Sequence, residues 1–197
     1  MVGAAPGRVG DVGGVHGQGA AGRCYCCGVQ VRAVMSHEAD EVDALVRSAF
    51  LTAPVSDGCE QDLVKRLRSS PGYLPDLELV AVEEGRIVGH ILTTRITIDG
   101  RTGPVDALEV APLCVALERR GRGLGAQLME ETLRRGRAAG FPAVFLVGDP
   151  RYYGRFGFRP VAELGIRNAG PVPDDVVLGV ALMPDVLEGV GGSVTLL

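Results

Sequence analysis

The sequence lacks several features that common classes of protein require. It contains no tryptophan, and aromatic residues occupy only 5% of its 197 positions. No stretch approaches the roughly 20 apolar residues that a membrane-spanning helix needs, and the N-terminus has no continuous apolar run of the secretory kind. The formal net charge is −4, which does not suit general binding of polyanions. We therefore expect a cytoplasmic protein with no membrane and no nucleic acid among its partners.

The sequence is also poor in metal-binding and disulfide patterns. Cys24, Cys26 and Cys27 are crowded together, whereas Cys59 and Cys114 are isolated. An odd number of cysteines without paired spacing argues against a disulfide framework. A zinc site would need a further cysteine or histidine pair at ligand spacing, which the three histidines do not supply. We expect no metal cofactor.

The remaining composition fits one domain behind an unusual N-terminus. With 46% hydrophobic residues the chain can build a core without disulfides or metal. Residues 1–28, however, hold nine of the 29 glycines and show no apolar periodicity, so they cannot bury enough surface to offset the entropy of ordering. The sequence predicts a disordered Gly-rich tail over 1–28 and a domain over 29–197. A translation start at Val29 or Val31 is an open alternative, which intact-mass spectrometry would settle.

Hydrophobic periodicity predicts alternating strands and helices. Apolar residues from Val42 to Phe50 follow helical spacing behind a candidate cap at Ser36. The sequence predicts further helices over 59–69, 123–138 and 150–156, and strands over 29–33, 77–82, 87–98, 105–115, 145–147, 158–161 and 176–183. Antiparallel hairpins combined with one crossover helix imply an α/β (α+β) fold with a mixed sheet.

The most informative stretch runs from Arg119 to Gln127. It belongs to a basic strip, 116–160, with nine Arg or Lys against four Asp or Glu. A strand leads into it and an amphipathic helix leads out, so glycines and unpaired helix amides are placed to bind a phosphate or pyrophosphate. The stretch is not a Walker A loop, because no Gly-Lys-Ser/Thr follows. Its glycine spacing also differs from the Gly-x-Gly-x-x-Gly pattern of dinucleotide-binding folds. A solvated Gly-rich connector is the alternative.

Two segments resemble motifs of the GNAT superfamily of N-acetyltransferases. Arg120-x-x-Gly123-x-Gly125 is similar to the Gln/Arg-x-x-Gly-x-Gly/Ala motif whose backbone amides hold the pyrophosphate of acetyl-CoA in that family. Residues 148–158 resemble the family's Tyr-x-x-x-Gly-Phe segment, in the Asp-Pro-x-Tyr-Tyr-x-x-Phe-Gly-Phe form of a bacterial branch of predicted acetyltransferases. The resemblance covers about 29–183. It implies a mixed, mostly antiparallel sheet of about six to seven strands, flanked by helices, with the fourth and fifth strands splayed.

The resemblance also implies an activity and a set of cofactor contacts. Family members transfer an acetyl group from acetyl-CoA directly to an amine in a ternary complex. The acceptor here would be a primary amine of a small molecule or a peptide, and a homodimer is left open. The implied cofactor-binding positions are Leu113, Cys114, Val115, Arg120, Gly121, Arg122, Gly123, Leu124 and Gly125. Pro112 removes a hydrogen-bond donor from its strand, which fits an interrupted ladder there.

Two residues are candidates for proton transfer. Tyr153 stands four residues before Gly157, at the family's tyrosine position, and would protonate the departing thiolate; Tyr152 is its rival. Glu109 lies six residues before Val115, the spacing at which the histone-acetyltransferase branch carries its catalytic glutamate, and would act as the base. Deprotonation through a water chain is the alternative.

Several features leave other interpretations open. The family's asparagine before the fourth helix is not evident, because Gly148-Asp149-Pro150 stands there. A CoA-sensing module without catalysis, or a nucleic-acid-associated protein that uses the basic strip 116–160, would retain the same loop. The arginines at 134, 135 and 137 more simply complement a helix dipole, whereas those at 119, 120 and 122 are expected near the cofactor's phosphates. Cys114 and His90 are expected to be packing residues.

Overall fold

The computed structural model describes residues 22–23, 28–51, 58–101, 103–184, 187 and 191–196. Most of the predicted tail lies outside this part of the chain. Within the tail, Gly22–Arg23 form a short strand, β1, that pairs antiparallel with β2 (Val29–Ala33). The prediction of a disordered tail over 1–28 stays a prediction, because most of that segment lies outside the described residues.

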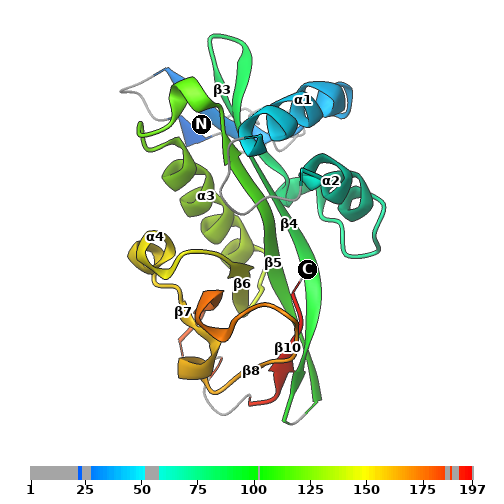
Figure 1. Cartoon of the computed structure of the whole chain (residues 1–197), viewed down its shortest axis with the longest axis vertical. Helices are drawn as coiled ribbons and strands as arrows, with labels where there is room; N and C mark the ends of the chain where they lie inside the picture. The colour runs from blue at the N-terminus through cyan, green and yellow to red at the C-terminus, as the bar shows by residue number, and fades with distance from the viewer. Residues whose placement is uncertain are drawn as a thin grey trace, which may run out of the picture.

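One mixed sheet organises the molecule (Figure 1). Its principal strands after β2 are β3 (Leu79–Glu83), β4 (Arg86–Gly100), β5 (Gly103–Val115), β6 (Ala143–Val147), β7 (Arg159–Pro160) and β9 (Val177–Ala181). They follow the order β2-β3-β4-β5-β6-β9-β7, and in this order the pair β5–β6 is parallel while the others are antiparallel. The predicted sheet of six to seven mostly antiparallel strands is confirmed.

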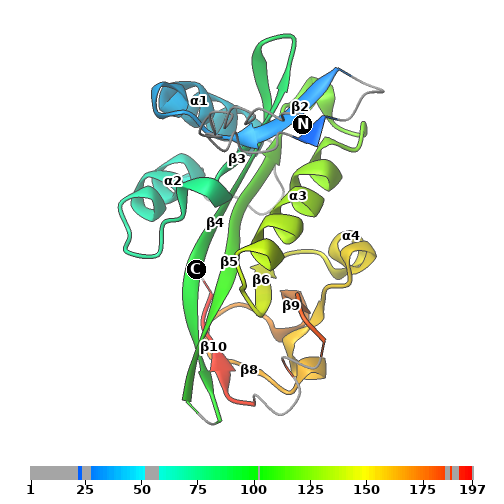
Figure 2. The ribbon, with the colours of Figure 1, turned by 180° about the vertical axis from the view of Figure 1, so that it is seen from behind.

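Helices cover both faces of the sheet. Helices α1 (Ala39–Phe50) and α2 (Glu60–Arg68) pack on one face, and α3 (Leu124–Ala138) packs on the other, as the two opposite views show (Figures 1 and 2). The short α4 (Pro150–Tyr153) follows β6, and the 3-10 turn Gly154–Phe156 extends it. Each predicted helix is present, within a few residues of its predicted limits.

The start of α1 differs from the prediction. The 3-10 turn Ser36–Glu38 precedes the helix, and the Ser36 side chain does not cap it. Instead, the Glu38 carboxylate accepts a hydrogen bond of 2.8 Å from the Met35 amide and bonds of 2.8 and 2.5 Å from the Arg32 guanidinium. Glu38 is the N-cap residue of α1 by position, but its carboxylate bonds Met35 and Arg32 rather than an amide of the first helical turn. Such charge-assisted bonds fix the 3-10 turn from which α1 begins.

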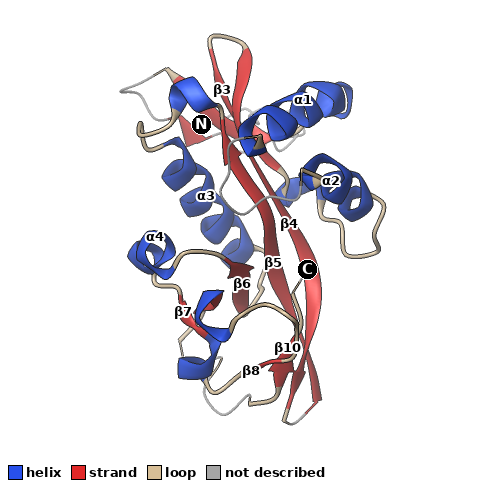
Figure 3. Ribbon diagram, in the orientation of Figure 1, coloured by secondary structure: helices blue, strands red, loops and turns tan. Residues whose placement is uncertain are grey.

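The long β4–β5 hairpin spans two hydrophobic cores. One core lies under α1, α2 and α3 and includes Val46, Leu79 and Leu128. The other lies at the far half of the hairpin, where Ile98 and Phe145 pack against the C-terminal segment. That segment contributes the short strands β8 (Arg167–Asn168) and β10 (Ser193–Val194), which close the lower end of the sheet (Figure 3).

A buried polar cluster fastens α2 to the sheet. Glu78, which is fully buried, accepts hydrogen bonds from Arg68 (2.6 Å), Tyr73 (2.6 Å) and His90 (2.9 Å). Burial opposes ionisation of Glu78, yet these three donors hold its pKa at about 2. Burial lowers the pKa of His90. The expectation that His90 is a core residue is confirmed.

The β5 strand parts from β6 before it ends, while it stays paired with β4 to Val115, and this separation positions the site. Its parallel pairing with β6 covers Leu108 and Glu109, after which β5 continues to Val115 without β6 beside it. On the other side, the register with β4 shifts between Ile91 and Thr93. Pro112, which has no amide proton, lies opposite that shift. The predicted splay of the two parallel strands is confirmed.

Candidate functional site

A cavity of about 630 Å³ opens at the end of β5. This size suits a small-molecule or cofactor site. Four parts of the chain line it: the end of α1, the end of β5, the Gly-rich loop with the start of α3, and α4 with the turn that follows. Its lining residues are Ala49, Phe50, Leu113, Cys114, Val115, Arg119, Arg120, Gly121, Gly123, Leu124, Gly125, Ala126, Asp149, Tyr152, Tyr153 and Arg155.

The Gly-rich loop gives the cavity an anion-binding wall. Gly121 and Gly123 adopt left-handed φ values of +75° and +80°, which other residues rarely adopt. Gly123 is also the N-cap of α3, so the amides of the first helical turn have no partners within the helix. Those amides and the positive end of the helix dipole meet the cavity at Leu124, Gly125 and Ala126.

The three loop arginines differ in what they contact. Arg119 forms an ion pair with Glu83, at the end of β3. Arg120 donates hydrogen bonds to the Ala49 carbonyl (2.6 Å) and the Val115 carbonyl (3.3 Å). Arg122 is exposed and has no hydrogen bond or ion pair among the described residues. Two of the three side chains expected near cofactor phosphates are therefore engaged with the protein itself.

Two adjacent tyrosines form the opposite wall of the cavity. The rings of Tyr152 and Tyr153 meet edge to face, with centroids 4.8 Å apart. The Tyr152 hydroxyl lies beside Gly125, 2.7 Å from the place where a Cβ would stand. The Tyr153 ring packs against Gly148 instead, where a Cβ would lie 2.2 Å from its Cε2. The two hydroxyl-bearing rings thus adjoin different parts of the cavity: the start of α3 and the end of β6.

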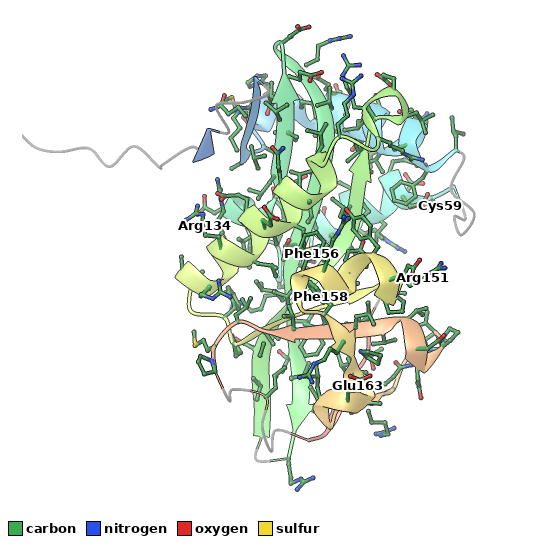
Figure 4. The ribbon with its side chains drawn as sticks, turned by 90° about the vertical axis from the view of Figure 1, so that its left-hand side faces the viewer. Cys59, Arg134, Arg151, Phe156, Phe158 and Glu163 are labelled. Atoms are coloured by element: carbon green, nitrogen blue, oxygen red, sulfur yellow. The ribbon has the colours of Figure 1, made fainter. Side chains whose placement is uncertain are left out.

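Tyr153 is held as a neutral phenol. Burial, with a smaller contribution from Tyr152, raises the pKa of Tyr153 to about 12. A phenol with this pKa stays protonated throughout the neutral range, as a proton donor must. Its ring also contacts Phe158, which is buried below α4 (Figure 4).

Asp149 occupies the place of the asparagine that the family often carries there. Its carboxylate accepts a hydrogen bond of 2.9 Å from the Arg151 amide, which makes it the N-cap of α4, and Pro150 follows as the first helical residue. The Arg151 side chain returns to Asp149 at 2.8 Å and lies on the outer side of α4 (Figure 4). Arg155 stacks its guanidinium 3.9 Å from the centroid of the Tyr152 ring.

Cys114 is a wall residue rather than a nucleophile. It is buried, and desolvation raises the pKa of its thiol to about 12. A thiol attacks as its thiolate, so this environment keeps the sulfur unreactive. The expectation of a packing role is consistent with this geometry.

Glu109 stands apart from the cavity. It is buried, with 2% of its surface exposed, and pairs with Thr94 of β4 and Phe145 of β6 at the last parallel register position. Four residues separate it from Leu113, which is about 13 Å along an extended strand. The structure therefore gathers the predicted loop, strand-end and tyrosine residues around one cavity and leaves Glu109 at the fork where β5 and β6 part.

Sequence patterns missed part of the cavity wall. Ala49 and Phe50 belong to α1, 60 or more residues before the loop, and nothing in their pattern indicates that they meet it. Arg155 lies within segment 148–158, but it stands at a position that the motif leaves unspecified. The basic strip 116–160 also has fewer unpaired positive charges than its composition suggests. Arg134 and Arg135 both form ion pairs with Glu131 at 2.7 Å on α3.

The described residues contain neither a metal-ligand cluster nor a membrane-spanning helix. In that part of the chain, no group of three or more His, Cys, Asp or Glu residues is arranged to hold a metal ion. None of its helices is both long and apolar enough to cross a membrane.

The sheet with one parallel, splayed strand pair and a Gly-rich turn at the start of α3 is the architecture of an acyltransferase. Residues 30–161 match the acetyltransferase (GNAT) domain family. The chain belongs to the GNAT family and is an N-acetyltransferase.

Curated relatives and solved structures agree with this family. The uncharacterised N-acetyltransferase YhbS of Escherichia coli K12 is 33% identical over 83% of this chain and 93% of its own. YjhQ of the same strain, also an uncharacterised N-acetyltransferase, is 35% identical over 71% and 77%. The crystal structure of E. coli YhbS in complex with CoA matches with a TM-score of 0.75 and 29% identity, over 91% of this chain and 92% of that one. A Brucella melitensis GNAT acetyltransferase in complex with acetyl-CoA matches with a TM-score of 0.66 and 27% identity, over 79% and 89%.

Proposed function

We propose that this protein binds acetyl-CoA in the cavity at the end of β5 and transfers its acetyl group to a primary amine in a ternary complex. One observation carries the proposal: the Gly-rich turn, the end of β5 beyond its pairing with β6 and the Tyr153 ring all open into the same cavity. The CoA and acetyl-CoA bound by the two structural relatives support this choice of ligand.

The cofactor would lie along the cavity from the loop to the strand fork. Its pyrophosphate would accept hydrogen bonds from the amides of Gly123, Leu124 and Gly125, with the α3 dipole adding attraction. Its pantetheine arm would take the place of a strand beside Leu113 and Val115, whose β6 side has no partner strand. This arrangement puts the thioester near the point where β5 and β6 part.

The transfer needs three functions from the protein. A backbone amide at the end of β5 would polarise the thioester carbonyl, so that the amine attacks it and forms the new C–N bond. The C–S bond then breaks, and the Tyr153 hydroxyl gives its proton to the departing thiolate. Glu109, at the fork, would accept through water the proton that the amine loses, because its buried side chain stands apart from the cavity.

The first experiment combines binding with turnover. Isothermal titration with acetyl-CoA, followed by release of free CoA thiol in the presence of pooled primary amines, is expected to show both. Binding without thiol release would instead favour a CoA-sensing module, and no binding would contradict the interpretation of the loop.

Two substitutions test the proton donor. Tyr153→Phe is expected to lower kcat by about 10²–10⁴ while the Kd for acetyl-CoA changes little, because the ring keeps its packing. Tyr152→Phe is the matched control, with its hydroxyl beside Gly125, and should affect cofactor affinity more than kcat. Reversal of these two outcomes would make Tyr152 the acid.

The base is tested in the same way. Glu109→Gln keeps the shape of the side chain but removes the proton acceptor, so kcat should fall by about 10²–10⁴ and lose the acidic limb of its pH profile. An unchanged kcat with an unchanged pH profile would assign deprotonation to a water chain instead.

A further inference from the structure

Arg120 joins three elements that are far apart in sequence. Its guanidinium donates to the carbonyl of Ala49 in α1 at 2.6 Å and to that of Val115 in β5 at 3.3 Å, while its backbone lies in the Gly-rich loop. Each of these elements also lines the cavity. The side chain is therefore placed where α1, the strand end and the loop meet.

The Ala49 carbonyl lies in the last turn of α1 and accepts a hydrogen bond from Arg120. The last four carbonyls of a helix have no amide partner within the helix, so they take partners from outside it. Ala49 itself is buried, with 1% exposed surface. A buried carbonyl without a partner is costly, and a cation at a helix C-terminus also complements the dipole.

The same geometry commits part of this exposed side chain to the protein itself. Of the five guanidinium donors, those on Nε and Nη2 include the two that bond the carbonyls of Val115 in β5 and Ala49 in α1. Arg122, by contrast, is exposed in the same loop without a partner among the described residues.

We propose that the Arg120 side chain is a positioning residue: it fastens the C-terminal turn of α1 to the Gly-rich loop, and so sets the wall formed by Ala49 and Phe50 against the loop. This inference rests on the proposed acetyl-CoA site for its effect on binding, but the fastening of α1 is independent of any ligand. A cofactor would then meet a preformed cavity, rather than one that must be assembled on binding.

Charge and geometry can be separated at this position. Arg120→Lys keeps the positive charge but cannot make both carbonyl bonds with one fork, whereas Arg120→Gln removes the charge as well. If Arg120 served only as a cation for phosphate, Arg120→Lys would keep the acetyl-CoA affinity. If Arg120 acts through its two directed hydrogen bonds, Arg120→Lys would not keep it. Arg122→Gln removes the same charge from the same loop and is the matched control for the exchange of the α1 amides.

The experiment is hydrogen exchange of the unliganded full-length protein, followed by titration with acetyl-CoA. We expect exchange of amides 47–51 to become roughly tenfold faster in both Arg120 variants and to stay at the wild-type rate in Arg122→Gln. Both Arg120 variants should also raise the Kd for acetyl-CoA by a similar factor. Cooperative thermal unfolding of each variant checks that it is folded.

Two results would overturn the proposal: wild-type exchange in α1 of Arg120→Gln, or full recovery of acetyl-CoA affinity in Arg120→Lys. If wild-type protein does not bind acetyl-CoA, the proposed function fails, yet the exchange measurement still tests the fastening of α1 on its own.

Discussion

Gly148 offers a steric test of the position of Tyr153. A Cβ at Gly148 would lie 2.2 Å from Cε2 and 2.8 Å from Cδ2 of the Tyr153 ring. Ordinary contact begins at about 3.4 Å, so Gly148→Ala must displace the ring by about 1.2 Å. The substitution therefore moves the proposed proton donor while leaving its chemistry intact.

The expected loss follows from that displacement. A misplacement of about 1 Å in a reacting group costs about 10²-fold in rate, so kcat should fall by about this factor. Overpacking costs about 1–3 kcal/mol of folding stability, which thermal unfolding would measure separately. The Kd for acetyl-CoA should change much less, because the Gly-rich loop that we propose for the pyrophosphate is a separate segment from Gly148.

Gly154→Ala is the matched control. Gly154 follows Tyr153 directly, has helical φ and ψ of −57° and −29°, and has no atom within 4 Å of its Cβ position. The assay is release of CoA thiol at saturating acetyl-CoA with pooled primary amines. Gly154→Ala should behave as wild type.

A double substitution tests whether Gly148→Ala lowers kcat through the Tyr153 hydroxyl. In a Tyr153→Phe background the hydroxyl is already absent, so Gly148→Ala should cause little further loss of kcat. A full additional 10²-fold loss there would show that Gly148 acts through another group. Wild-type kcat for Gly148→Ala alone would remove Tyr153 from the reaction.

Two further predictions concern the loop and the buried cluster. Gly123→Asp should raise the Kd for acetyl-CoA at least 10²-fold by titration, because it sets a carboxylate against the pyrophosphate. Gly140→Asp is the control: Gly140 has the same left-handed φ near +80° at the other end of α3, and its substitution should leave this Kd unchanged. Glu78 has a folded pKa of about 2 against an ordinary 4.5. It therefore contributes stability above about pH 4.5, at most about 3 kcal/mol, that is lost as pH falls toward 2. The difference in urea stability between wild type and Glu78→Gln should shrink over that range, and a constant difference would contradict the linkage.

Local patterns were sufficient for much of the fold. Helical spacing from Val42 to Phe50 and the turn at 83–86 placed α1 and the β3–β4 hairpin, because both signals come from residues close together in the chain. The Gly-rich loop was found for the same reason, since its strand, glycines and helix are contiguous. The prediction of Ser36 as a cap was wrong because a 3-10 turn, held by Glu38 and Arg32, occupies Ser36–Glu38 and moves the start of α1 to Ala39.

The tertiary structure decided how distant parts of the chain complete the site. The sequence determined by itself that a Gly-rich turn precedes α3 and that Tyr153 follows β6, since each rests on a short, continuous motif. It did not determine that the end of α1 lines the same cavity, that Arg120 turns toward Ala49, or that Glu109 lies at the fork. These facts depend on packing between segments up to 71 residues apart, where burial and unpaired backbone carbonyls, not local spacing, select the partners.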